Sequence, residues 1–535
     1  MWNRIALCLL VLAKLAHDQS ARFTVAGQVI RPNGNPVRGA HVAILPSRSP
    51  DKQVATVTSE NGAFGFSGVP AGKYALQVNY KGITRLYNQN EQFSTAVVVG
   101  PGLDSEHILF TLEPLGAIAG SVLDEGGDPV RNASVYLFTR SVDRGVARTR
   151  LKETTTTATD GSFHFTRLQK GTYYVAVAGR PWYAQYAMPS PRSVPLPAPD
   201  QVLTPESPPP PAELNVAYPV TYYGDVTSPE AASAIQVDFD ARVEVHMNLH
   251  PVPALHLTLD GAENNDKQRS SVTLSVLGPG GTLLNVPTGS SGPNDLMGVA
   301  PGKYVITHHS RWNENQSTAL GEQTLALNSD STVHLNEGVK TSVKGKIVAD
   351  GPLPERMAVL LESVENSNHA SGLIQSDGSF IMPEVLPGRY DMRLANAPQL
   401  YMQSVVVKGA EYSKGALQIS AGEQIEVTIT TARGLTSIGG IAVKDGKPVA
   451  GAMVLAIPRD DRYGNYIPRD QSDTDGTFSL MFAPPGRYTV LAIEDGRGLE
   501  YANAKVIEPY LASGRVIDVP LPSETILNIE VQARK

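Results

Sequence analysis

Apolar and polar residues alternate along most of this chain, in short runs separated by turns that contain glycine or proline. The run Val25-Ala-Gly27-Gln-Val29 has apolar side chains two positions apart around a central glycine. Alternation with a period of two predicts a strand with one buried face, and the inner glycine predicts close approach of another backbone. The same pattern recurs at 118–122, 343–347 and 438–442. These runs predict that one type of strand is used repeatedly.

A second signature marks the repeat more strongly. Two glycines stand ten positions apart, and the second is followed by a Lys, Arg or Thr and then a Tyr. The pairs are Gly62 and Gly72, Gly161 and Gly171, Gly292 and Gly302, Gly378 and Gly388, and Gly476 and Gly486. A fixed signature of this kind indicates copies of one supersecondary unit.

The residues around these glycines predict two kinds of corner. In four copies the first glycine follows Asn61, Asp160, Asp377 or Asp475. Such dipeptides favour two-residue hairpin turns in which both central residues have positive φ. The Tyr after the second glycine is expected to point inward and hydrogen-bond the backbone, which would lock the corner.

Six to seven short strands in about 90 residues, with no credible helix, are typical of a β-sandwich. The sequence therefore predicts an all-β protein, a tandem array of five Ig-like or transthyretin-like β-sandwich domains. The predicted boundaries are a signal peptide at 1–21, then sandwiches at 22–114, 115–250 with a Pro-rich insertion at 181–212, a degenerate 251–340, 341–433 and 434–535.

Composition narrows the class of protein. The 535 residues are 41% hydrophobic and 18% charged, which is typical of a folded chain. A net charge of -7 without a basic cluster argues against nucleic acid as a partner. The single cysteine, Cys8, lies in the apolar run 5–13, which predicts a signal peptide, with a buried N-terminal strand as the alternative. We therefore expect an exported protein without disulfides, in the periplasm, on the outer surface or outside the cell, with no transmembrane segment after cleavage.

Together these motifs resemble a known family. The order Gly-x-Val, Gly-x-Pro-Val-x-Gly-Ala-x-Val, Asp-Gly-x-Phe-x-Phe and Pro-x-Gly-x-Tyr is similar to the carboxypeptidase regulatory-like domain. The resemblance implies a transthyretin-like fold, related to carbohydrate-binding-like and collagen-adhesin B-type sandwiches. The segment 217–224 resembles multi-module exported proteins of soil bacteria, acidobacteria in particular. The adhesin likeness also leaves open a Lys–Asn cross-link inside a sandwich.

Candidate metal sites are weak. His334 and Glu337 have zinc-ligand spacing, but the only later histidine is His369, and catalysis needs three converging ligands with a general base. Asp470, Asp473 and Asp475 resemble the start of a calcium loop, but the downstream acidic ligand is missing. We assign the first pattern to chance and the second to a turn, and predict no catalytic, metal or cofactor-binding residue.

Aromatic residues at the two ends of the proline-rich insertion form the one candidate ligand site. They are Trp182, Tyr183, Tyr186, Tyr222 and Tyr223. Exposed rings stack on sugar faces or on peptide prolines. The alternative is that these rings fold back and cover the end of the second sandwich.

These observations predict an exported, non-enzymatic, monomeric rod that serves as a structural or adhesive scaffold at the cell envelope. One alternative is an array of carbohydrate-binding modules that recognises polysaccharide. Another is an accessory protein of an outer-membrane transporter or peptidase system. The expected partners are a polysaccharide or a surface protein, and no cofactor is expected.

Overall fold

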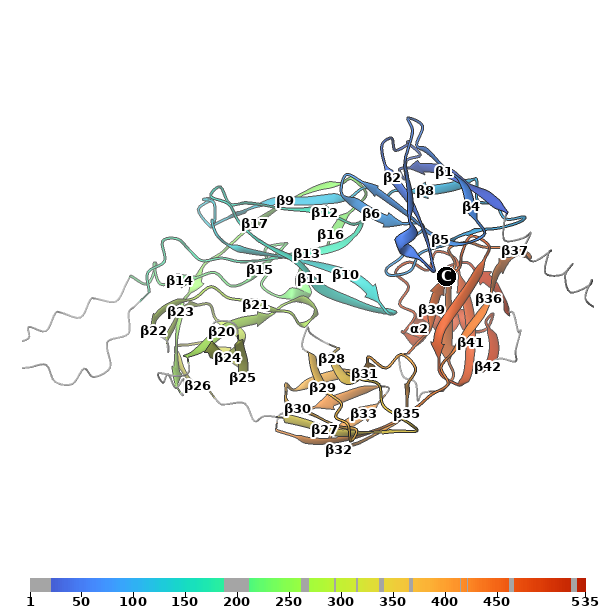
Figure 1. Ribbon diagram of the computed structural model, residues 1–535. Coiled ribbons are helices and arrows are strands. Elements are labelled where there is room, and N and C mark those ends of the chain that lie inside the picture. Colours follow the sequence, from blue (N-terminus) through green and yellow to red (C-terminus); the bar gives the residue numbers. More distant parts are fainter. Residues whose placement is uncertain are drawn as a thin grey trace, which may run out of the picture.

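Nearly all regular structure in this protein is β-strand (Figure 1), which confirms the predicted all-β array of sandwiches. The computed structural model describes residues 21–186, 211–260, 269–292, 295–313, 316–335, 341–364, 369–413, 415–420, 422–460, 466–520 and 527–535. Nearly all of the predicted signal peptide and most of the proline-rich insertion therefore lie outside the described residues.

The first repeat folds into two sheets with strand orders β4-β1-β8 and β3-β2-β5-β6, and β7 pairs with β5. Alternate residues of both sheets, among them Val25, Val42 and Leu76, meet in one buried core. The strands are β1 (Arg22–Ile30), β2 (His41–Pro46), β3 (Val54–Val57), β4 (Ala63–Pro70), β5 (Gly72–Tyr80), β6 (Ile83–Leu86), β7 (Val97–Val99) and β8 (Ile108–Thr111), with a 3-10 turn η1 (Pro50–Lys52).

The second repeat has the sheets β12-β9-β17 and β11-β10-β13-β15, with β16 on β13. Its core is separate from the first and includes Ile118, Phe165 and Met247. The strands are β9 (Gly116–Leu123), β10 (Ser134–Asp143), β11 (Val146–Thr156), β12 (Ser162–Leu168), β13 (Gly171–Ala178), β14 (Val216–Ala217), β15 (Thr221–Tyr222), β16 (Ile235–Val237) and β17 (Arg242–Asn248), with a 3-10 turn η2 (Pro229–Ala231).

The third repeat keeps the same plan despite its weaker sequence signature. Its sheets are β22-β23-β19-β26 and β21-β20-β24-β25, around a smaller core that includes Leu257 and Tyr304. A short pairing of β14 with β18 joins it to the second repeat. The strands are β18 (Val252–Pro253), β19 (Leu255–Asp260), β20 (Arg269–Leu277), β21 (Leu283–Asn285), β22 (Gly289–Gly292), β23 (Asp295–Val299), β24 (Gly302–Asn313), β25 (Gln316–Leu327) and β26 (Ser331–His334), with a 3-10 turn η3 (Pro279–Gly281).

The fourth repeat has the sheets β30-β27-β35-β32 and β29-β28-β31-β34-β33. Val343, Leu361 and Ile429 belong to its core. The strands are β27 (Thr341–Ala349), β28 (Ala358–Ser363), β29 (His369–Leu373), β30 (Ser379–Val385), β31 (Gly388–Ala395), β32 (Tyr401–Lys408), β33 (Glu411–Ser413), β34 (Ala416–Ile419) and β35 (Gln424–Ala432).

In the fifth repeat β43 pairs with strands of both layers, namely β36 and β41. The strands of this repeat therefore form one continuous network, β37-β36-β43-β41-β38-β39, with β40 on β36 and β42 on β41. Its core includes Ile438, Val454 and Tyr488. The strands are β36 (Thr436–Lys444), β37 (Lys447–Pro448), β38 (Met453–Pro458), β39 (Arg469–Gln471), β40 (Thr477–Ala483), β41 (Gly486–Ile493), β42 (Arg515–Val519) and β43 (Leu527–Gln532).

One pairing rule is common to all five repeats. The opening strand runs parallel to the closing strand and antiparallel to the strand after the first signature glycine, as β1 does with β8 and β4. In the four repeats whose opening strand has a central glycine, that glycine lies at this crossing. A Cβ built on Gly27 would stand 2.0 Å from the carbonyl oxygen of Ile108, and one on Gly120 would stand 2.1 Å from that of Val245. The predicted close backbone approach is therefore confirmed.

The turns before the repeat glycines differ from the predicted two-residue hairpins. Gly62 and Gly161 have φ of 76° and 73°, whereas Asn61 and Asp160 are not among the described residues with positive φ. The turn also joins strands of different sheets, since β3 pairs with β2 and β4 with β1. The hairpin prediction was wrong because the Asp160 carboxylate accepts the Ser162 amide at 3.0 Å, so that the glycine alone takes the left-handed conformation.

The predicted tyrosine corner is confirmed in every repeat. The hydroxyl of Tyr74 donates to the carbonyl of Pro70 at 2.9 Å, four residues earlier. The ring is buried and the hydroxyl satisfies a backbone acceptor, which ties the turn to the following strand. The other four bonds are Tyr173 to Gln169, Tyr304 to Ala300, Tyr390 to Leu386 and Tyr488 to Pro484.

The fifth repeat carries a helix that the sequence pattern did not predict, α2 (Ala504–Leu511). The Asn503 side chain caps it by accepting the Lys505 amide at 3.1 Å. Ile507 and Tyr510 are buried and pack with Leu455 and Leu491 of the sheet. The helix escapes a periodicity search because it is short and contains Pro509.

The structure also differs from the expected rod, because the two end repeats are in contact. Figure 1 shows the repeats following one another around a ring, with the first beside the fifth. Hydrogen bonds join Ala96 and Val98 of the first repeat to Asp473 and Thr474 of the fifth. The reason is a complementary polar interface between segments that the sequence keeps far apart. No helix among the described residues has the length and hydropathy needed to cross a bilayer.

Candidate functional site

The aromatic candidates come from a loop that leaves β13 at the end of the second sandwich and from the segment that returns through β14 and β15. The described ends of this loop are tied together by the backbone, since the Gln185 amide donates to the Leu214 carbonyl at 2.8 Å. Trp182 and Tyr183 precede this hydrogen bond in the chain, and Tyr218 follows it.

Trp182 is the exposed member of the set, with 72% of its surface open to solvent. Its ring meets Tyr183 edge to face, with centroids 5.8 Å apart and an interplanar angle of 90°. An aromatic pair of this geometry holds the indole in place without covering both of its faces. The arrangement therefore presents one flat apolar surface to solvent.

A carboxylate anchors this pair to the sandwich. Glu125, in the turn between β9 and β10, accepts hydrogen bonds from the hydroxyls of Tyr183 and Tyr218, the latter at 3.0 Å. Burial, and secondarily the nearby Glu125 charge, raise the pKa of Tyr183 to about 12. The same causes raise the pKa of Tyr218. Both phenols are therefore neutral donors at ordinary pH, and they keep the loop end fixed.

Tyr186 serves a different contact, between the second and third repeats. A Cβ built on Gly298 would stand 2.4 Å from the Tyr186 ring, so the ring lies directly on that glycine. The Arg180 guanidinium lies over the same ring, 5.0 Å from its centroid. Tyr186 thus packs at a joint between repeats rather than beside Trp182.

Tyr222 lies between the second and third repeats, and Tyr223 lies against the core of the second. Tyr222 is only 1% exposed and packs with Tyr136, Phe138 and Leu284. Burial is the main cause that raises its pKa. Tyr223 is half-buried against the main core. Of the five predicted ligand-binding residues, the structure therefore brings together Trp182 and Tyr183, and it places the other three elsewhere.

The three aspartates that resemble a calcium loop are occupied by protein groups. Asp470 accepts the Ser479 amide at 2.6 Å, and Asp475 accepts the Thr477 amide at 3.0 Å. Asp473 accepts the Ala96 amide of the first repeat at 2.9 Å. Burial raises the pKa of Asp470. These carboxylates act as turn and interface acceptors.

The remaining metal candidates do not converge in the part of the chain that the structure describes. His334 pairs with Asp260 at 2.8 Å on neighbouring strands, and Glu337 lies outside the described residues. No group of three His, Cys, Asp or Glu side chains there is arranged to hold a metal ion.

The sequence pattern missed the residues that join repeats. Arg148, near the tip of the β10–β11 hairpin, lies 3.7 Å from Asp391 of the fourth repeat. Burial raises the pKa of Asp391, while the Arg148 charge opposes that rise. At the tip itself, the Gly145 carbonyl accepts the Ala502 amide of the fifth repeat at 3.1 Å. The one visible signal was hairpin length, since β10 and β11 exceed their counterparts in the first repeat.

Comparison with solved structures finds two pilins and the Bacillus anthracis TIE protein at low identity. The chain is similar to the minor pilin GBS52 of Streptococcus agalactiae, with 14% identity, a TM-score of 0.21 and coverage of 43% of this chain and 96% of that chain. It is similar to the Bacillus anthracis TIE protein, with 13% identity, a TM-score of 0.18 and coverage of 77% and 74%. For BcpA, the major pilin subunit of Bacillus cereus, the identity is 9%, the TM-score 0.15 and the coverage 77% and 100%. TM-scores this low describe no common overall arrangement.

The match at the level of sequence families is more direct. No curated protein matches the chain. The model of the carboxypeptidase regulatory-like domain matches residues 24–112 and 117–202, which carry the strand order, crossing glycines and tyrosine corners of the first repeat and most of the second. The carboxypeptidase regulatory-like model thus matches two repeats in tandem.

Proposed function

We propose that this chain is an exported, non-enzymatic structural or adhesive scaffold of the cell envelope. The observation that carries the proposal is that each repeat has a core of its own, closed by its own pair of layers. Carboxylates of the signature turns support the same role, because they form structural hydrogen bonds. Asp160 and Asp377, for example, hold the turns of the second and fourth repeats through Ser162 and Ser379.

The scaffold role also fits the way the repeats are joined. Contacts between repeats include ion pairs and backbone hydrogen bonds, such as those of Arg148 with Asp391 and of Ala502 with Gly145, and an apolar cluster shared by the second and third repeats. Joints of this kind hold the sandwiches in a set arrangement, while each sandwich keeps a core of its own. Such a molecule positions surfaces in space.

Fractionation of the organism that encodes the chain tests this proposal. We expect the protein in the envelope or extracellular fractions, and we expect proteins or polysaccharides of the envelope to co-purify with it. Enrichment in the cytosol would contradict export. A hydrolytic activity that co-purifies with the recombinant chain, and that disappears on its removal, would contradict the non-enzymatic role.

A second candidate function is polysaccharide binding at Trp182, favoured by its exposed ring and its fixed neighbour Tyr183. The ring would stack on a sugar face, and the hydrogen bond from Tyr183 to Glu125 would keep the platform in place. We expect Trp182→Ala to abolish retention on an immobilised polysaccharide array and to leave the thermal unfolding unchanged. Tyr466→Ala is the matched control, since Tyr466 is also exposed but lies on the fifth repeat. Equal retention of the wild type and both variants would exclude the site.

A further inference from the structure

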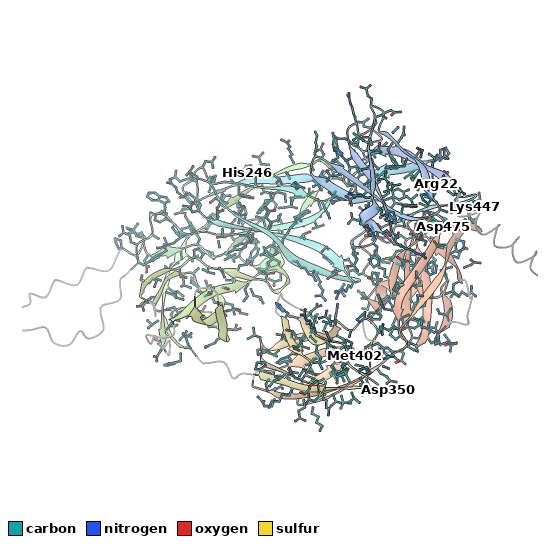
Figure 2. The ribbon with its side chains drawn as sticks, viewed as in Figure 1. Arg22, His246, Asp350, Met402, Lys447 and Asp475 are labelled. Carbon is teal, nitrogen blue, oxygen red and sulfur yellow. The ribbon has the colours of Figure 1, made fainter. Side chains whose placement is uncertain are left out.

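The first and fifth repeats meet at the edge of β7, a strand whose one sheet neighbour among the described residues is β5. In Figure 2, Asp475 of the fifth repeat lies where these two repeats meet. The turn that carries it, 473–476, begins with Asp473 and Thr474. A strand edge of this kind presents unpaired backbone groups that can recognise another segment.

Residues of the turn form hydrogen bonds with the backbone groups that this edge presents to the fifth repeat. The Ala96 amide donates to the Asp473 carboxylate at 2.9 Å, and the Val98 amide donates to the Thr474 hydroxyl at 2.8 Å. In return, the Thr474 amide donates to the Ala96 carbonyl at 3.0 Å. Two side-chain oxygens and one amide thus replace the groups that a neighbouring strand would supply. Lys73 on β5 also pairs with the Asp473 carboxylate.

The residues of this turn distinguish the fifth repeat from the others. The two positions that correspond to Asp473-Thr474 hold other residue pairs in the other repeats. They are Ser59-Glu60 in the first repeat, Ala158-Thr159 in the second, Gly289-Ser290 in the third and Gln375-Ser376 in the fourth. The Asp-Thr pair therefore occurs in the fifth repeat alone. In the second repeat, Thr159 and Asp160 stand at the positions equivalent to Thr474 and Asp475, and both residues are exposed.

Around the turn, the interface is polar although much of it is buried. The Arg469 side chain is only 2% exposed and lies 2.8 Å from the Glu91 carboxylate. Its guanidinium stacks on the Phe93 ring at 4.5 Å. The Gln471 side chain donates to the Thr95 hydroxyl at 2.9 Å. An interface held by hydrogen bonds and an ion pair resembles the contacts of transient assemblies, because water can replace its bonds when it separates.

We propose that the edge of β7 is a docking site for the Asp473–Thr474 turn of the fifth repeat, and that this contact holds the first repeat against the fifth and opens without unfolding either sandwich. The proposal concerns the shape of the molecule and stands independently of the scaffold role. Loss of this contact in the test below would leave the fractionation result unaffected.

Thr474→Pro tests the docking in the full chain. The Gly476 amide donates to the Asp473 carbonyl at 2.9 Å, so Thr474 is the second residue of a four-residue turn, where proline is well tolerated. The substitution removes both the amide that donates to Ala96 and the hydroxyl that accepts from Val98. The turn itself can still form with proline at this position. Thr159→Pro places the same residue at the equivalent exposed position of the second repeat and is the matched control.

Two measurements report the result. Hydrogen exchange followed by mass spectrometry should show the amides of Ala96 and Val98 exchanging at least about tenfold faster in Thr474→Pro than in the wild type or in Thr159→Pro. Small-angle scattering should show a larger radius of gyration for Thr474→Pro alone. The double variant Asp473→Ala/Thr474→Ala, which keeps the backbone unconstrained, should behave as Thr474→Pro does.

Several outcomes would overturn the proposal. One is unchanged exchange at Ala96 and Val98 in both the proline variant and the double alanine variant. Another is an equal effect of Thr159→Pro. A third is a wild-type scattering curve that already corresponds to an extended chain, which would mean that the docked form is not populated in solution.

Discussion

The crossing glycines provide the sharpest test of the repeat fold, and the fifth repeat offers a matched pair. Gly440 is buried where β36 passes between β40 and β43, and Gly439 is its neighbour on the same strand. A Cβ built on Gly440 would lie 2.4 Å from the Leu527 carbonyl oxygen and 2.5 Å from the Phe478 ring. A Cβ built on Gly439 would meet no heavy atom closer than 4.0 Å.

The expected magnitude follows from these distances. An ordinary contact of a Cβ is 3.4 Å or more, so Gly440→Ala requires β43 and the ring to move by about 1 Å. That movement weakens the parallel pairing that runs from Gly440↔Leu527 to Val443↔Glu530. Overpacking and the loss of one or two ladder bonds together cost about 2–4 kcal/mol. Gly439→Ala instead gains about 0.5 kcal/mol, because alanine loses less backbone entropy in a strand.

The assay must resolve single repeats, because separate cores do not unfold in one transition. Hydrogen exchange by mass spectrometry over 436–443 and 527–532 reports the opening free energy of the fifth repeat. We expect it to fall in Gly440→Ala, to stay level or rise slightly in Gly439→Ala, and to remain unchanged in the peptides of the fourth repeat. Equal protection in the two variants would refute the argument that close backbone contact selects glycine here.

Three further predictions concern other parts of the fold. Tyr488→Phe removes a buried hydroxyl that donates to a backbone carbonyl at 2.9 Å, and should lower the opening free energy of the fifth repeat by about 1–2 kcal/mol in the same exchange assay; no change would mean that the hydroxyl adds no net stability. The raised pKa of Tyr183, about 12, means that its stabilising contribution is complete below the unfolded value near 10 and is lost as the pH rises through the folded value. In an alkaline absorbance titration Glu125→Gln should lower that pKa, and identical curves would contradict the assigned contact. Hydrogen bonds from Ser162 lower the pKa of Asp160, so its contribution is present above the unfolded pKa and lost as the pH falls through the folded one; Ser162→Ala should raise that pKa in an NMR titration, and an unmoved resonance would show another cause.

Much of the local structure was predictable from short stretches of sequence. The alternating runs around Gly27 and Gly120 predicted both the strands and the close approach at the crossing, because a period of two and a missing side chain act within a few residues. The tyrosine corners were predictable for the same reason, since each hydroxyl bonds a carbonyl four residues earlier. The turn type was mistaken because the pattern Asp-Gly fits more than one turn, and the choice depended on a side-chain bond and on which sheet the next strand joined.

The candidate site was predictable only in part. The concentration of aromatic residues singled out the region of Trp182, whose ring is exposed, but no local pattern distinguished it from the buried Tyr222. Burial of Tyr222 depends on side chains such as Leu284, which belongs to the next repeat. Glu125, which holds Tyr183 and Tyr218, comes from a turn far earlier in the chain.

The amino-acid sequence by itself determined the repeated strands and the residues that close their corners, because each depends on neighbours a few positions apart. Only the tertiary structure decided how the repeats are arranged and which side chains join them. Ala96 and Asp473 are 377 positions apart, and their hydrogen bond forms because two folded surfaces come together. Complementarity between such surfaces depends on every repeat that lies between them, and so no pattern within a single repeat encodes it.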